Sequence, residues 1–131
     1  FTFTIKKISC QKVMVVDDER SNVELIKRCL DSEELEFLEA YDGNEAVIKA
    51  QAELPSLILL DMMLPELDGY GVIERLRLNT ETRQIPVLIM SGYNVDEDRL
   101  CQKERDCGVP VLIKPFKPSD LRHQVKLMLN N

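Results

Sequence analysis

Tryptophan is absent from this chain of 131 residues, and histidine occurs only once, at His123. The four cysteines, Cys10, Cys29, Cys101 and Cys107, form no Cys-x-x-Cys pair. This spacing favours reduced thiols in a cytoplasmic protein over a zinc site or a disulfide framework. No apolar run approaches the roughly 20 residues that span a bilayer, and no signal-peptide pattern opens the chain.

An excess of basic residues is also missing. Lysine and arginine total 17 against 23 aspartates and glutamates, which gives a net charge of -6. Non-specific binding to nucleic acid or to an anionic membrane rewards a basic surface, so neither is expected. No Gly-x-Gly-x-x-Gly follows the first predicted strand, which excludes a dinucleotide-binding domain. The length suits one domain with its own core.

Short β-type runs alternate with helical periods about five times along the chain, which predicts an α/β fold: a five-stranded parallel sheet with helices on both faces. Strands are expected at 12–16, 35–40, 57–60, 86–91 and 109–113. Helices are expected at 21–30, after the turn at 42–44, after Asp68, at 95–106 and at 119–129.

Two helix starts carry capping signals. Ser21 and Glu24 are spaced as a capping box, with a helix start one or two residues earlier as the alternative, and Asp68 can cap the helix that follows it. The helix predicted at 95–106 has few apolar positions, and helices that bury little are the ones expected to move.

The run Leu57-Ile58-Leu59-Leu60 leads directly into Asp61, as a strand buried on both faces does. Polar residues end three other predicted strands as well. Because parallel strands bring their carboxyl ends to one edge of a sheet, these side chains are expected to converge there. The set is Asp17, Asp18, Asp61, Ser91 and Lys114.

Three converging carboxylates repel one another unless a cation neutralises them, and hard oxygen ligands suit Mg²⁺. Lys114 supplies a point charge for a phosphoryl oxygen, and Ser91 a hydroxyl donor. An aspartate in such surroundings is equipped to attack phosphorus and hold an acyl phosphate.

These motifs, with Met62-Met63-Leu64-Pro65-Glu66-Leu67-Asp68-Gly69, Met90-Ser91-Gly92 and Lys114-Pro115-Phe116, resemble the receiver domain of two-component response regulators over about residues 10–130. The resemblance implies a doubly wound, flavodoxin-like (βα)5 fold with strand order 2-1-3-4-5. It implies phosphotransfer from a phosphohistidine to Asp61, with Mg²⁺ held by Asp17, Asp18, Asp61 and the backbone carbonyl of Met63. Ser91 and Lys114 would then contact the phosphoryl group.

The same resemblance implies a cis peptide between Lys114 and Pro115, and an influence of Met63 and Tyr93 on how fast the phosphoryl group is lost. Val111 departs from the family, which most often has a mobile aromatic three residues before the lysine. Switching is therefore expected to rest mainly on Ser91 drawing in the loop that leads to 95–106.

Residues 1–9, which begin Phe1-Thr2-Phe3-Thr4, are surplus to a receiver domain at 10–131. They resemble the last strand of a histidine-kinase ATP-binding domain, which would make the chain part of a hybrid kinase. An ordinary leader is the alternative.

The resemblance implies a partner surface formed by 95–106, 110–113 and 119–129, which would dock a histidine kinase, a histidine phosphotransfer domain or a second receiver. His123 is expected on the surface, away from the site.

A domain of this kind promotes its own phosphotransfer but is not a stand-alone turnover enzyme. A magnesium-dependent phosphatase is disfavoured because it needs a second aspartate where Met63 stands. An interaction module that never takes phosphate is the remaining alternative.

Overall fold

A computed structural model describes residues 11–31, 35–62, 64, 67, 69–91, 110–113 and 116–129. Several predictions lie outside the described residues: those for the N-terminal leader, the helix at 95–106, Asp68, Tyr93 and the Lys114–Pro115 peptide bond. Met63, Lys114 and the side chain of Ser91 also lie outside them.

The centre of the fold is a parallel five-stranded sheet of order β2-β1-β3-β4-β5. This is the predicted doubly wound, flavodoxin-like order, and every strand lies where it was expected, with small shifts at the ends. Strand β3 is buried along its whole length, as its unbroken apolar run predicts. The strands are β1 (Gln11–Val16), β2 (Leu35–Ala40), β3 (Leu57–Asp61), β4 (Val87–Ser91) and β5 (Val111–Ile113).

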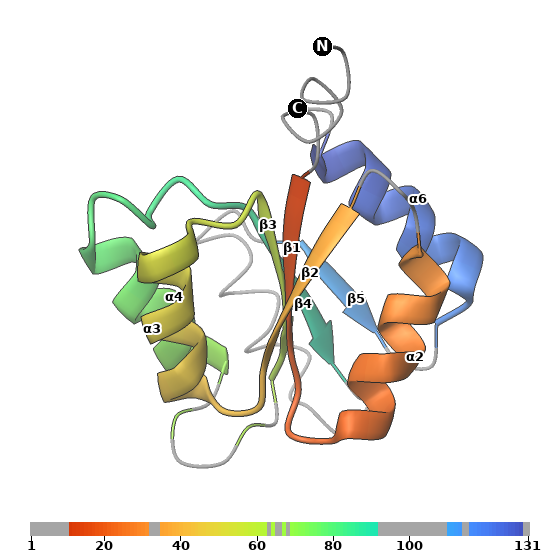
Figure 1. The fold of residues 1–131 in the computed structure, drawn as a ribbon, viewed down its shortest axis with the longest axis horizontal. Coiled ribbons are helices and arrows are strands. Elements are labelled where there is room, and N and C mark those ends of the chain that lie inside the picture. The colour runs from red at the N-terminus through yellow and green to blue at the C-terminus, as the bar shows by residue number, and fades with distance from the viewer. Residues whose placement is uncertain are drawn as a thin grey trace, which may run out of the picture.

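Helices cover both faces of this sheet (Figure 1). Helices α3 and α4 lie on one face, and α2 and α6 lie on the other. Each face has its own hydrophobic core: Met14, Ile58 and Leu60 point to the α3–α4 side, and Val13, Leu57 and Leu59 to the α2–α6 side. The helices are α2 (Arg20–Leu30), α3 (Gly43–Glu53), α4 (Gly69–Leu78) and α6 (Pro118–Leu129).

Helix α2 starts at Arg20, as the alternative of an earlier start predicts, and not with the capping box. Ser21 lies inside the helix, and the N-cap residue is Glu19, whose side chain makes no capping hydrogen bond. The Ser-x-x-Glu spacing therefore has no capping role here, because the chain turns into the helix directly after Asp17 and Asp18. The first turn of α2 is held by other contacts, described below.

Helix α3 is capped at both ends by its neighbours. The Asp42 side chain accepts a hydrogen bond from the Glu45 backbone N–H at 2.7 Å, as N-cap aspartates do. At the other end, Leu54 has φ 47° and ψ 63°, the left-handed conformation that favours glycine. Its backbone N–H still donates to the Ala50 carbonyl at 2.9 Å, so the helix ends in a strained residue.

Replacing Leu54 with glycine is expected to stabilise the fold. The left-handed conformation costs a β-carbon residue about 1–2 kcal/mol. The greater freedom of glycine in the unfolded chain offsets part of this cost, which leaves a gain of about 0.5–1 kcal/mol. Urea unfolding measures the gain. The matched control is Gln51→Gly, an exposed position inside the same helix, which should lose about 1 kcal/mol. A loss of stability in Leu54→Gly would contradict the strain argument.

Candidate functional site

Three aspartates meet at the carboxyl edge of the sheet. Asp17 directly follows β1 and Asp61 ends β3, and these strands are neighbours with Val16 paired to Leu60. One carboxylate oxygen from each of Asp17, Asp18 and Asp61 lies within 4.8 Å of the other two. Their predicted convergence is therefore confirmed.

The two aspartates that follow β1, Asp17 and Asp18, differ in burial. Asp17 is fully buried, and Asp18 is exposed. The Asp17 backbone N–H donates to the Ala40 carbonyl of β2 at 3.1 Å, which extends the β1–β2 ladder by one residue. Its Oδ1 accepts from the Glu19 backbone N–H at 3.0 Å. Asp17 thus fixes the turn that presents Asp18.

This donor set fits a hard divalent cation. Mg²⁺ binds oxygen ligands at about 2.1 Å, so its opposite ligands lie about 4.2 Å apart. The 4.8 Å span of the three carboxylates is close to that separation. Asp61 is 7% exposed, so the cluster combines two buried carboxylates with one that faces solvent. Such like charges at close range repel, and a bound cation relieves the repulsion.

The other predicted site residues end or follow β4, which adjoins β3, and β5, which adjoins β4. Asp61 pairs with Met90, and Ser91 is the next residue and the last of β4. Ser91 in turn pairs with Ile113 at the end of β5, the residue before Lys114 in the sequence. The backbone therefore brings the positions of Asp61, Ser91 and Ile113 to one edge. The Ser91 side chain, Lys114 and the Met63 carbonyl are outside the described residues.

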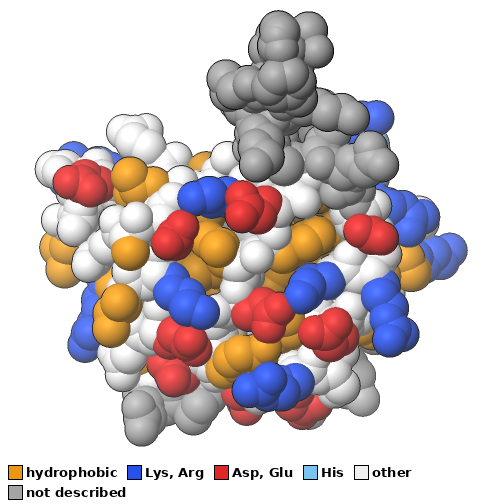
Figure 2. Space-filling model, viewed as in Figure 1, with side chains coloured by type: hydrophobic (Ala, Val, Ile, Leu, Met, Phe, Trp, Pro, Cys, Tyr) orange, Lys and Arg blue, Asp and Glu red, His pale blue; other side chains and the backbone are white. Residues whose placement is uncertain are grey.

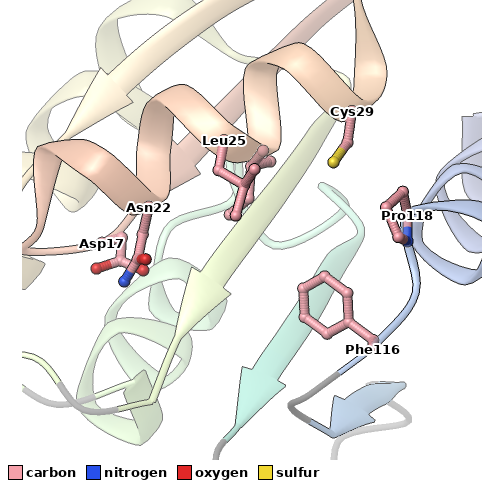
Figure 3. Close-up of a pocket in the computed structure, with 7 residues that line it drawn as sticks. Asp17, Asn22, Leu25, Cys29, Phe116 and Pro118 are labelled. Atoms are coloured by element: carbon pink, nitrogen blue, oxygen red, sulfur yellow. The ribbon is translucent and has the colours of Figure 1, made fainter.

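A pocket of about 430 Å³ adjoins the cluster through Asp17. It lies between α2 and the segment leading into α6. Figure 3 shows the Asp17 and Asn22 side chains at one end and Cys29 and Pro118 at the other. The remaining lining residues are Leu25, Ile26 and Phe116. The approach to Asp17 from this side is thus mostly apolar.

A polar network beside the site was not predicted from the sequence. Lys27 of α2 donates to Glu39 at 2.5 Å, and the Tyr41 hydroxyl donates to the other Glu39 oxygen. The Arg20 guanidinium lies 4.9 Å from the centre of the Tyr41 ring. Figure 2 shows alternating acidic and basic side chains on this face of the molecule. The only sequence signal was the i, i+7 spacing of Arg20 and Lys27, which places both near one side of a helix.

The charges in this network reinforce one another. The hydrogen bond from Lys27 lowers the pKa of Glu39, and the same contact raises the pKa of Lys27. The hydrogen bond to the Glu39 carboxylate raises the pKa of Tyr41. Glu39 therefore stays ionised and the Tyr41 hydroxyl stays protonated around neutral pH, so the Tyr41 ring is held in place.

The sequence pattern of the response regulator receiver domain matches residues 13–126. The chain belongs to this family. Among curated relatives, PhoP, the alkaline phosphatase synthesis transcriptional regulatory protein of Bacillus subtilis (strain 168), is 36% identical over 119 residues. The match covers 91% of this chain and 48% of PhoP, so this receiver domain spans about half the length of that relative.

Solved receiver structures share the fold. The receiver domain of a sensor histidine kinase from Pseudomonas aeruginosa PAO1, solved with a magnesium ion coordinated in its active-site cleft, has a TM-score of 0.81 and 27% identity. The match covers 93% of this chain and 99% of that one. The chemotaxis protein CheY4 of Vibrio cholerae has a TM-score of 0.80 and 26% identity, and the match covers 91% of this chain and 98% of that one.

Among the described residues of this chain, no helix is both long enough and apolar enough to cross a membrane.

Proposed function

We propose that this receiver domain takes a phosphoryl group onto Asp61, with Mg²⁺ held by Asp17, Asp18, Asp61 and the Met63 backbone carbonyl. The observation that carries the proposal is the convergence of three carboxylate oxygens within 4.8 Å at the carboxyl edge of the sheet. Membership of the receiver family supports the same assignment, because such domains work in two-component signalling.

The proposed donor is a phosphohistidine of a histidine kinase or a histidine phosphotransfer domain. A carboxylate oxygen of Asp61 bonds to phosphorus while the bond from phosphorus to the donor nitrogen breaks, and the imidazole leaves with a proton. The metal, when bound, offsets the negative charge on the phosphoryl oxygens. Asp17 is held by backbone hydrogen bonds on both its amide and its carboxylate, so it is pre-positioned as a ligand.

Ser91 and Lys114 are the proposed contacts of the phosphoryl oxygens. The support is their place in the sheet, since β4 ends beside β3 and β5 ends beside β4. Val111 is half-buried against the α3–α4 core. Its branched side chain has no ring to swing between two positions, so we assign the switch to Ser91 and the loop after it.

The face formed by 95–106, 110–113 and 119–129 is the proposed docking surface, for the phosphodonor or a second receiver.

Phosphorylation by acetyl phosphate tests the proposal. Intact mass should show the gain of a single phosphoryl group that needs Mg²⁺ and disappears in EDTA. Asp61→Asn should show no gain, and Glu36→Gln, which neutralises an exposed carboxylate on β2, should behave as the parent chain. Absence of any gain, together with no binding of beryllofluoride, would favour the phosphorylation-independent interaction module instead.

A further inference from the structure

We propose that Tyr41 and Arg20 are positioning residues for the metal ligands: their contact holds the turn that carries Asp17 and Asp18. The inference rests on the proposed function, since it concerns the affinity of that site for Mg²⁺. Neither side chain belongs to the acidic cluster itself, and both belong to the network at the carboxyl end of β2.

Helix α2 begins without a capping hydrogen bond from its own N-cap side chain. The Glu19 side chain makes no capping hydrogen bond, and the first turn of α2 contains no acidic residue. Arg20, the first residue of the helix, follows Asp18 by two positions and stacks over the Tyr41 ring at 4.9 Å. A guanidinium over an aromatic face is attracted by the ring quadrupole, so this contact holds the first turn against β2.

The second step is that the Tyr41 ring is itself fixed. Its backbone N–H donates to Glu45 Oε1 at 2.7 Å, and its hydroxyl donates to Glu39. Glu39 also binds Lys27, which lies two helical turns after Arg20. Helix α2 is therefore joined to the end of β2 at two points, and the ring cannot turn away without breaking the hydrogen bond from its hydroxyl to Glu39.

The third step links the ring to the ligands. Tyr41 follows Ala40, whose carbonyl accepts the Asp17 backbone N–H. The Asp17–Asp18–Glu19 turn is thus bounded by the Ala40 hydrogen bond on one side and the Arg20 stacking contact on the other. Loosening the stacking contact should let Asp18, which is exposed, move away from Asp17 and Asp61. The Asp18 carboxylate would then have to be ordered when Mg²⁺ binds, and the cost of this ordering weakens the affinity for Mg²⁺.

Tyr41→Leu, which removes the ring, is expected to weaken Mg²⁺ binding about two- to fivefold, the range of an exposed cation–π contact. Tyr41→Phe keeps the ring but loses the hydroxyl that binds Glu39, so its affinity should lie between those of Tyr41→Leu and the parent chain. Calorimetric titration with MgCl₂ measures the affinity. In the metal-free protein, the amide resonances of Asp18 and Glu19 should shift in Tyr41→Leu and shift less in Tyr41→Phe.

Arg20→Gln separates positioning from simple electrostatics. Removing a positive charge near a cation site should tighten Mg²⁺ binding by Coulomb's law, whereas loss of positioning should weaken it about two- to fivefold. Arg122→Gln, which removes an exposed charge on α6, is the control for net charge. The double variant Arg20→Gln/Tyr41→Leu should bind no more weakly than either single variant, because both remove the same contact.

Equal or tighter Mg²⁺ binding in Arg20→Gln would overturn the positioning role, and so would an unchanged affinity in Tyr41→Leu. Failure of the proposed function is a separate result. It would appear as no saturable Mg²⁺ binding by the parent chain, or as binding that survives Asp61→Asn, and the positioning role would then be overturned with it.

Discussion

Asp61→Asn should make the metal-free protein more stable while abolishing its response to Mg²⁺. Three carboxylates whose oxygens lie within 4.8 Å repel one another, and two of them are buried. A pair of unit charges 4 Å apart interacts by about 1–4 kcal/mol in surroundings between water and a protein surface. Removing one charge is therefore expected to raise the free energy of unfolding in EDTA by about 2 kcal/mol and Tm by roughly 5–10 °C.

Mg²⁺ should stabilise the parent chain much more than it stabilises Asp61→Asn. The parent chain should be stabilised by about 2.7 kcal/mol when Mg²⁺ is present at 100 times its Kd, whereas Asp61→Asn should gain little. Thermal unfolding in EDTA and in MgCl₂ measures both effects, with Glu36→Gln as the control for neutralising a carboxylate away from the cluster. Lower stability of Asp61→Asn in EDTA would mean that the aspartates are not under mutual repulsion.

The second large effect is expected at Gly43, where α3 meets the segment that follows Asp61. A β-carbon added at Gly43 would collide with the Leu67 carbonyl oxygen and would lie 2.9 Å from Leu67 Cβ. It would also lie 3.0 Å from Cγ2 of Val72, which is fully buried. A backbone atom cannot move aside as a flexible side chain does. Gly43→Ala should therefore cost about 1–3 kcal/mol, even though alanine favours helices.

Urea unfolding of Gly43→Ala measures this cost, and Gln51→Ala, at an exposed position of the same helix, should change stability by less than about 0.5 kcal/mol. Gly69→Ala is a useful comparison because the nearest atom to its added carbon is the Sδ of Met62, at 2.5 Å. That sulfur belongs to a flexible side chain, so Gly69→Ala should cost less. A neutral Gly43→Ala would contradict the close approach of α3 and Leu67.

Much of the fold could be predicted because it depends on local patterns. The unbroken apolar run of β3 fixes a strand buried on both faces, and helical spacing identifies the inward positions Val72, Ile73 and Leu76 of α4, all buried as expected. Parallel strands bring their ends together whatever the sequence between them, so Asp17, Asp18 and Asp61 could be placed at one edge. His123 is exposed, also as predicted.

What the sequence did not reveal depends on tertiary contacts. The start of α2 has contacts with Asp17 and Tyr41, through the Glu19 backbone N–H and the Arg20 guanidinium, and not the Ser21–Glu24 capping box that the local pattern suggests. Tyr41 looks like an ordinary residue before a turn, because nothing local shows that α2 packs its basic side against the end of β2. Likewise, the need for glycine at position 43 arises from Leu67, which is distant in sequence.

The central claim, that Asp61 carries the phosphoryl group, is tested most directly by trapping the acyl phosphate. The protein is treated with acetyl phosphate and Mg²⁺ and then with borohydride, which reduces an aspartyl phosphate to homoserine, and the peptides are sequenced by mass spectrometry. The account predicts homoserine at position 61 alone, and none when Mg²⁺ is withheld. Homoserine at Asp17 or Asp18, or phosphate retained on a serine, threonine or histidine with Asp61 intact, would contradict it.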